Sequence, residues 1–136
     1  MTQKRKSKRT ESAYQKCGEY IKFERRRRSM TLQQVGDYVG VSANYVSEIE
    51  RGLKPPSDQF ITKFCEYTAV DSREIYSRLK RAPEYAIEEL NKNIVAQELI
   101  IEIGKNKKLK QKDKERIYNQ LLQWYKEVLD SPKKWR

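Results

Sequence analysis

The fold is decided by residues 31–52, which read TLQQVGDYVGVSANYVSEIERG. Thr31 and Gln34 are spaced as a capping box, in which a hydroxyl and a side-chain amide satisfy unpaired backbone N–H groups at a helix start. Three apolar residues then follow at helical spacing as the buried side of that helix: Val35, Tyr38 and Val39. Gly40 suits the left-handed conformation that ends a helix. The sequence therefore predicts a short helix between Thr31 and Gly40.

A second helix is expected almost immediately, over residues 42–51, with Ser42 as its N-cap and Gly52 at its end. The i, i+4, i+7 spacing places one set of side chains on a packing stripe: Ser42, Val46, Ile49 and Leu53. Another stripe is left for a partner: Ala43, Asn44, Ser47, Glu48 and Arg51. Two helices joined by so short a connection form a helix-turn-helix.

Three further helices are expected around this pair. The first covers residues 11–28 and carries Tyr14, Cys17 and Ile21 at helical spacing. The next begins after Ser57 as N-cap, following Pro55 and Pro56, and carries Phe60, Ile61, Phe64 and Cys65. The last opens at a second capping box, residues 71–74, and runs to about Lys80. Without strand-like alternation, the chain is expected to be all-α, with a five-helix domain over residues 11–81.

Beyond Pro83, the sequence predicts a C-terminal helical region over residues 84–130 and a tail over residues 131–136. Its first helix has a wide apolar side and is expected to close at Gly104. A lysine-rich segment, residues 105–112, is expected to be a solvated connection. Asp113 then caps a final helix that ends at residues 130–132.

The composition narrows the possible partners. The chain has 136 residues, with 30 Lys and Arg against 19 Asp and Glu, for a formal net charge of +11. Such an excess favours a polyanion, and nucleic acid is expected ahead of a membrane surface. The length suits one domain with an appendage, which excludes a large two-domain enzyme.

Several classes of chemistry are excluded by the residue types. The sequence has no histidine, which removes imidazole bases, catalytic triads and most zinc sites. Cys17 and Cys65 lie far apart without a CxxC motif and are expected to be reduced core residues. No apolar run approaches the ~18 residues of a membrane helix, and the basic N-terminus is not followed by the apolar segment of a secretory signal. We therefore expect a cytoplasmic protein that is not an enzyme and uses no metal or cofactor.

From about Cys17 to Leu79 the chain resembles the lambda-repressor/Cro-like, or XRE-type, helix-turn-helix DNA-binding domain. The resemblance lies in residues 31–52 followed by Pro56-Ser57, with a small residue at 36, Gly at 40, Val41-Ser42 and Ile49-Glu50-Arg51-Gly52 in the register of the family. It implies that the second short helix enters the major groove of double-stranded DNA. The residues that then face the bases are Ser42, Ala43, Asn44, Ser47 and Glu48. Asn44 suits an adenine edge, Glu48 a cytosine amino group and the Ala43 methyl a thymine methyl.

Other residues acquire roles from the same resemblance. Candidates for the DNA backbone are Thr31, Gln33, Gln34, Tyr45, Arg51 and Lys54, which would position the domain without reading sequence. The family often has Gln where this chain has Leu32, and Gln33 is the candidate that replaces that contact. Arg25 and Glu50 fall where the family makes a buried ion pair between the first helix and the recognition helix.

The N-terminal ten residues are read as a basic flexible arm, because they carry five cations and no acid: Lys4, Arg5, Lys6, Lys8 and Arg9. Two roles remain open for this arm. It could add only non-specific attraction, or it could follow a groove beside the recognition helix. In both cases it should steepen the salt dependence of DNA binding.

The C-terminal helices are expected to join two copies of the chain, because a single unit of this type reads few base pairs. The residues expected to dimerise are Ile87, Leu90, Ile94, Leu99, Ile101, Ile103, Ile117, Leu121, Tyr125 and Leu129. These helices could instead fold back on the DNA-binding domain or bind a protein such as an antirepressor or a toxin. The function expected is a dimeric repressor, and the alternative is an antitoxin-type protein whose helix-turn-helix autoregulates its operon.

Overall fold

The computed structural model describes residues 2–131, with side chains from residue 13 onward, and every regular element in that range is a helix. The predicted all-α class is confirmed. The chain divides into two compact units, residues 1–87 and residues 88–136. Within the described range, no helix is long and apolar enough to cross a membrane.

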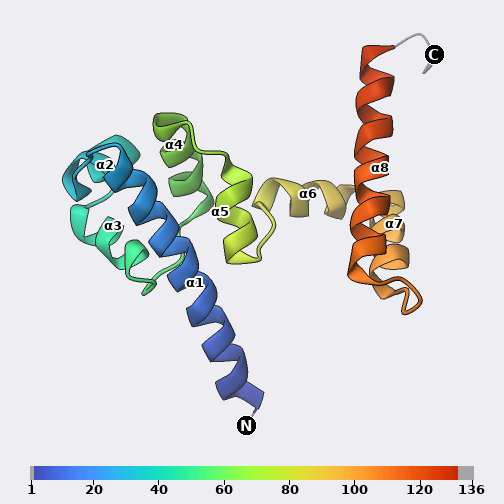
Figure 1. The fold of residues 1–136 in the computed structure, drawn as a ribbon, viewed down its shortest axis with the longest axis horizontal. Helices are drawn as coiled ribbons and strands as arrows, with labels where there is room; N and C mark the ends of the chain where they lie inside the picture. Colours follow the sequence, from blue (N-terminus) through green and yellow to red (C-terminus); the bar gives the residue numbers. More distant parts are fainter. Residues whose placement is uncertain (1, 132–136) are drawn as a thin grey trace. The chain divides into compact units, whose positions relative to one another are not determined.

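The first unit contains α1 (Thr2–Arg27), α2 (Leu32–Val39), α3 (Ala43–Glu50), α4 (Asp58–Thr68) and α5 (Ser72–Leu79). Helix α1 packs against α3 and α5, and α2 packs against α3 and α4 (Figure 1). The core between them is made of Cys17, Ile21, Val35, Val39, Val46, Ile49, Phe60, Ile61, Phe64, Val70, Ile75 and Leu79. This is the five-helix arrangement of the lambda-repressor-like fold that the sequence predicted.

The helix-turn-helix is held by the caps that the sequence predicted. The Thr31 hydroxyl accepts the Gln34 N–H at 3.1 Å, and the Gln34 side-chain oxygen accepts the Thr31 N–H at 2.8 Å. Gly40 ends α2 in the left-handed region, with φ at 88°. Ser42 then caps α3 by accepting the Tyr45 N–H at 3.0 Å. These local bonds set where both helices start and stop.

Two glycines allow helices to approach more closely than a side chain would permit. A Cβ on Gly36 would lie 2.5 Å from the carbonyl oxygen of Val41, at the turn between α2 and α3. A Cβ on Gly18 would overlap the carbonyl oxygens of Ile49 and Glu50, where α1 crosses the end of α3. The family register indicated a small residue at position 36 but gave no signal for Gly18, because α1 and α3 meet only in the tertiary structure.

The substitution Gly18→Ala is therefore expected to lower the free energy of unfolding by about 1–3 kcal/mol, as overpacking typically does. Gly104→Ala is the matched control, because a Cβ there meets nothing within 4 Å and alanine favours the helix by up to ~1 kcal/mol. Urea unfolding followed by circular dichroism measures both. Equal stability of the two variants would show that α1 can move away from α3 at little cost.

The N-terminal segment differs from its prediction. Residues 2–10 belong to α1, whereas a flexible arm was expected. Helix nucleation is the costly step and extension is cheap, so a segment that continues from the packed part of α1 can stay helical in spite of its charge. Whether this segment contacts DNA stays a prediction.

Three smaller expectations in the first unit were also wrong. Tyr38, expected on the buried side of α2, is 48% exposed and stacks on Tyr67, with 3.7 Å between the ring centroids. Leu53 was placed on the packing stripe of α3 but is 62% exposed, because it follows Gly52, where α3 has ended and φ is 75°. Asp71 caps α5, accepting the Arg73 N–H at 2.9 Å. Glu74 does not complete a capping box and instead pairs with Arg78 at 2.9 Å, one helical turn further along.

After Pro83 the structure has three helices where two were expected: α6 (Glu84–Lys92), α7 (Ile94–Lys105) and α8 (Gln111–Asp130). The predicted long helix is broken at Asn93, whose side chain caps α7 by accepting the Ala96 N–H at 3.1 Å. The boundary between the units falls within α6. It does not fall at Pro83 because the Glu84 N–H donates to Asp58 at 2.8 Å and ties the start of α6 to the first unit.

The ends of α7 and α8 also differ from prediction. Gly104 lies inside α7, and Asn106 follows as the C-cap. Asp113 is not the N-cap of α8 but lies in its first turn, where its carboxylate accepts the N–H of Lys110, the N-cap residue, at 3.0 Å. The predicted final helix is otherwise confirmed through Asp130.

The second unit leaves most of its apolar side chains uncovered. Between residues 88 and 131, Ile103 is the one described apolar side chain that is buried. Of the residues expected to dimerise, Leu90 and Ile117 are half-buried. The exposed ones are Ile87, Ile94, Leu99, Ile101, Leu121, Tyr125 and Leu129. These apolar side chains are therefore exposed to solvent in the single chain.

Candidate nucleic-acid interface

The candidate interface is the outward side of α3 and the residues beside it. Asn44 and Ser42 are exposed, and the other predicted base-facing residues are half-buried: Ala43, Ser47 and Glu48. Opposite them, Val46 and Ile49 are fully buried in the core. A helix that is anchored on one side and open on the other can enter a groove without losing its packing.

Ser42 has a structural role in addition to its predicted one. Its hydroxyl oxygen accepts the Tyr45 N–H at 3.0 Å as the N-cap of α3. The hydroxyl hydrogen can still donate to a base or phosphate, since the cap uses only the oxygen lone pair.

Side chains on this face form a small polar network. The Asn44 amide donates to Glu48 at 3.4 Å, and Lys54 Nζ lies 3.0 Å from the other Glu48 oxygen. Lys54 also lies 5.7 Å from the centre of the Tyr45 ring, within cation–π range. Lys54 thus compensates the charge of Glu48, which would otherwise repel a phosphate backbone.

The predicted backbone-contacting residues lie at the start of α2, along α3 and in the segment that follows α3. Thr31 and Gln34 are exposed and hold the capping box, while Gln33 donates to Asp37 at 2.7 Å. Arg51 is exposed at the end of α3. Leu32, where the family often has Gln, packs instead against the core.

The Arg25–Glu50 ion pair implied by the resemblance is present. Arg25 Nε lies 2.8 Å from Glu50 Oε2, and Arg25 Nη2 lies 2.8 Å from Glu50 Oε1, with both residues buried. The hydrogen bonds to Glu50 raise the pKa of Arg25. The remaining nitrogen, Nη1, donates to the Met30 carbonyl at 2.7 Å. Arg25 therefore fastens α1 both to the end of α3 and to the segment that leads into α2.

The three arginines that follow Arg25 differ in their surroundings. Arg27 and Arg28 both pair with Glu24, at 3.0 Å and 2.5 Å. Although burial raises the pKa of Glu24, the hydrogen bond from Arg28 and the charges of both arginines lower it overall. Arg26 remains exposed. The consecutive arginines are visible in the sequence, but no pattern in it signals that Glu24 is buried beneath them.

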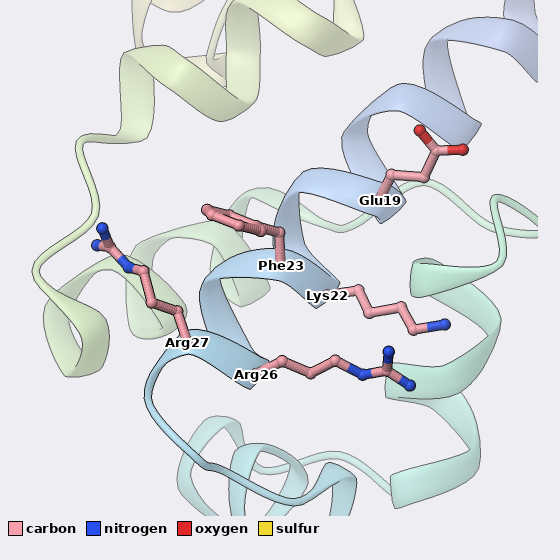
Figure 2. A pocket seen from close by; sticks show the side chains of 5 residues that line it. All are labelled: Glu19, Lys22, Phe23, Arg26 and Arg27. Carbon is pink, nitrogen blue, oxygen red and sulfur yellow. The ribbon is translucent and has the colours of Figure 1, made fainter.

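Beside this cluster, the outer side of α1 has a shallow depression of about 470 Å³ lined by Glu19, Lys22, Phe23, Arg26 and Arg27. Figure 2 shows Lys22 and Arg26 extending to one side of α1, and Phe23 and Arg27 to the other. Phe23 is 60% exposed. The depression is open and shallow, which is unlike the enclosed apolar pocket that a small-molecule ligand requires.

The cysteines match the expectation of reduced core residues: Cys17 is buried, and Cys65 is half-buried and packed against the core. Burial raises the pKa of the Cys17 and Cys65 thiols to about 11, so both stay protonated near neutral pH. Both are free thiols. In the part of the chain that the structure describes, no group of three or more Cys, Asp or Glu side chains is placed to hold a metal ion.

Comparisons with known proteins agree with this geometry. Residues 21–75 match the helix-turn-helix family model. Over 48 residues the chain is 40% identical to the transcriptional regulator ClgR of Mycobacterium tuberculosis, covering 35% of this chain and 43% of that protein. Over 61 residues it is 30% identical to an uncharacterized HTH-type transcriptional regulator of the same species, covering 45% of this chain and 44% of that protein.

The chain thus spans less than half the length of these curated relatives. No solved structure matches it significantly. The matched residues include α2, the turn and α3, with their caps and the Arg25–Glu50 pair. Residues 21–75 are therefore a helix-turn-helix domain of the lambda-repressor/Cro-like, XRE type.

Proposed function

We propose that this protein is a sequence-specific DNA-binding transcriptional regulator, a repressor that acts as a dimer on a two-fold symmetric site. The observation that carries the proposal is α3: Val46 and Ile49 anchor it in the core, while Asn44 and its neighbours are left open on a helix-turn-helix scaffold. The net charge of +11 supports a polyanionic partner. The matching relatives are named transcriptional regulators.

In this proposal α3 lies in the major groove and its exposed side chains read base edges. Asn44 donates to and accepts from an adenine, and Glu48 accepts from a cytosine amino group. Both side chains must leave their mutual hydrogen bond to do so. Lys54, which pairs with Glu48 in the unbound protein, then becomes available for a phosphate.

Dimerisation through the second unit supplies the second reading helix. One such domain reads few base pairs, and two domains on half-sites about 10 base pairs apart, or a multiple of that, read a longer sequence. The uncovered apolar side chains of α7 and α8 support this role, because Ile94 and Val95 are each 72% exposed in the single chain. A second copy would remove them from water.

The experiment that tests the proposed function compares the DNA upstream of the protein's own gene with a shuffled duplex of equal length. Binding is titrated at several salt concentrations, and the number of chains per duplex is determined in parallel. We expect the affinity for the native duplex to exceed that for the shuffled duplex by ~10³-fold or more, with two chains bound per native duplex. Equal and weak binding to both duplexes would mean that the protein is attracted only to the phosphates and does not recognise sequence. A stable complex with the product of a neighbouring gene would favour the antitoxin-type alternative.

Replacing Asn44 with alanine tests base reading directly. We expect cognate binding to weaken by ~1–3 kcal/mol while random-DNA binding is nearly unchanged, because only the cognate complex uses the amide. Asn91→Ala, at an exposed position of α6, is the matched control and should leave both affinities unchanged. An equal loss on cognate and random DNA would refute base reading by Asn44.

A further inference from the structure

The connection between α7 and α8 concentrates positive charge in a short segment. Within eight residues it carries five exposed lysines, which we call the lysine turn: Lys105, Lys107, Lys108, Lys110 and Lys112. Figure 1 shows this segment as the turn that joins α7 to α8. The sequence alone suggested only a solvated connection.

The backbone of the lysine turn is fixed by side-chain hydrogen bonds. The Asn106 side chain accepts the Lys108 N–H at 2.9 Å, and Asp113 accepts the Lys110 N–H at 3.0 Å. A sixth lysine, Lys114, reaches back from α8 and donates to the Gly104 carbonyl at 2.7 Å. The exposed ammonium groups therefore project from an ordered turn, which lowers the entropy lost when they bind a ligand.

Within the described part of the chain, none of the five lysines forms an ion pair with an acidic side chain. The nearby carboxylate of Asp113 is occupied by the backbone N–H of Lys110. Five like charges in so short a segment repel one another, and this repulsion is relieved by a ligand of high negative charge density. Duplex DNA, with one charge per ~1.7 Å of its axis, has that density.

A second copy of the chain fits the lysine turn less well. The apolar side chains of α7 and α8 suit a protein partner, but burying ammonium groups among them would cost several kcal/mol per charge. The acidic residues of α7 are dispersed along the helix, at Glu98 and Glu102. They do not form a patch with the charge density of the turn.

We propose that the lysine turn is a second phosphate-binding surface, which contacts the DNA backbone outside the base pairs read by α3. This inference rests on the proposed function in one respect, since it requires that the protein binds DNA. It does not require that the protein recognises a sequence. It assigns the second unit a role beyond dimerisation. Because the contacts are to phosphates, they add affinity and salt dependence without adding sequence preference.

The test uses the full-length chain with Lys107→Gln and Lys108→Gln together. Binding is measured from low to high salt on a duplex that extends about 10 base pairs, one helical turn, beyond each side of the site. The control variant, Lys92→Gln with Lys126→Gln, removes the same charge at exposed positions of α6 and α8 outside the turn. Sedimentation of each variant without DNA gives its oligomeric state.

If the turn binds phosphates, its double variant should flatten the log–log salt slope by about 1.8 per chain, which is about 0.9 per lost contact. Binding at low salt should weaken by roughly 10-fold or more, with the preference for the native duplex unchanged. The control should change the slope much less. Slopes that match between the two variants would overturn the inference, as would loss of self-association by the turn variant, which would assign the turn to a protein contact.

Failure of this inference is distinguishable from failure of the proposed function. If wild-type protein binds native and shuffled duplexes equally, the proposed sequence-specific function fails, while a flatter slope for the turn variant still supports phosphate binding by the turn. If wild-type protein binds no DNA, both fail.

Discussion

Arg25→Ala is expected to lower the free energy of unfolding of the first unit by about 3–5 kcal/mol. The substitution leaves the Glu50 carboxylate buried without its partner, and it removes the bond from Arg25 to the Met30 carbonyl. Both losses act where α1, α2 and α3 meet. Urea unfolding, monitored by circular dichroism at fixed protein concentration, measures the change.

Two variants distinguish the contribution of the ion pair to stability from a general effect of removing a charge. Arg26→Ala removes the neighbouring exposed arginine and should change stability by less than about 0.5 kcal/mol. Arg25→Met combined with Glu50→Leu removes both charges and should cost much less than the sum of the single changes, since no unpaired charge remains buried. A cost for Arg25→Ala no greater than that for Arg26→Ala would show that the pair does not brace the domain.

Placing lysine at two exposed apolar positions of the second unit, Leu99→Lys with Leu121→Lys, is expected to separate the proposed dimer. Leu99 is 44% exposed and Leu121 is 37% exposed in the single chain, so the chain itself can accommodate the longer side chains. Between two copies, each ammonium group would have to be desolvated without a partner. Cognate DNA binding should then weaken by roughly 10²–10³-fold, because the two reading helices no longer bind as one unit.

Sedimentation and DNA binding are measured on the same preparation, because the two results must change together. Asn119→Lys with Gln120→Lys is the control, which adds the same charge at exposed polar positions of α8. It should keep two chains together and bind cognate DNA at least as well as wild type. A leucine variant that remains dimeric with unchanged DNA affinity would exclude this surface as the dimer interface.

The helix-turn-helix could be predicted in detail because its determinants are close together in the chain. Thr31 with Gln34, Gly40, and Ser42 each act on backbone groups within four residues. Helix caps depend on such short-range geometry, so the sequence is sufficient to place them. The same holds for the division of α3 into a buried side and an open side, which follows from helical periodicity.

Contacts between residues far apart in the sequence could be predicted only from the family resemblance or were found only in the structure. The pairing of Arg25 with Glu50 joins residues 25 positions apart and was available only from the resemblance. The close approach at Gly18 and the burial of Glu24 beneath Arg27 and Arg28 were found only in the structure. Spacing along one helix does not reveal which residue of another helix will lie opposite.

The C-terminal half shows which local features helical periodicity does not predict. Its apolar pattern predicted helices correctly but suggested one helix where Asn93 separates α6 from α7, because periodicity can continue across a break that a local cap creates. The hydrogen bonds from the Lys108 and Lys110 N–H groups to Asn106 and Asp113, which order the lysine turn, were likewise not predicted from the sequence. The sequence by itself determined the all-helical class, the helix-turn-helix and the face of α3 that is open, since these depend on neighbours within one or two helical turns. Only the tertiary structure decided how α1 is fastened to that helix and which apolar side chains remain uncovered, because burial is a property of segments brought together from distant parts of the chain.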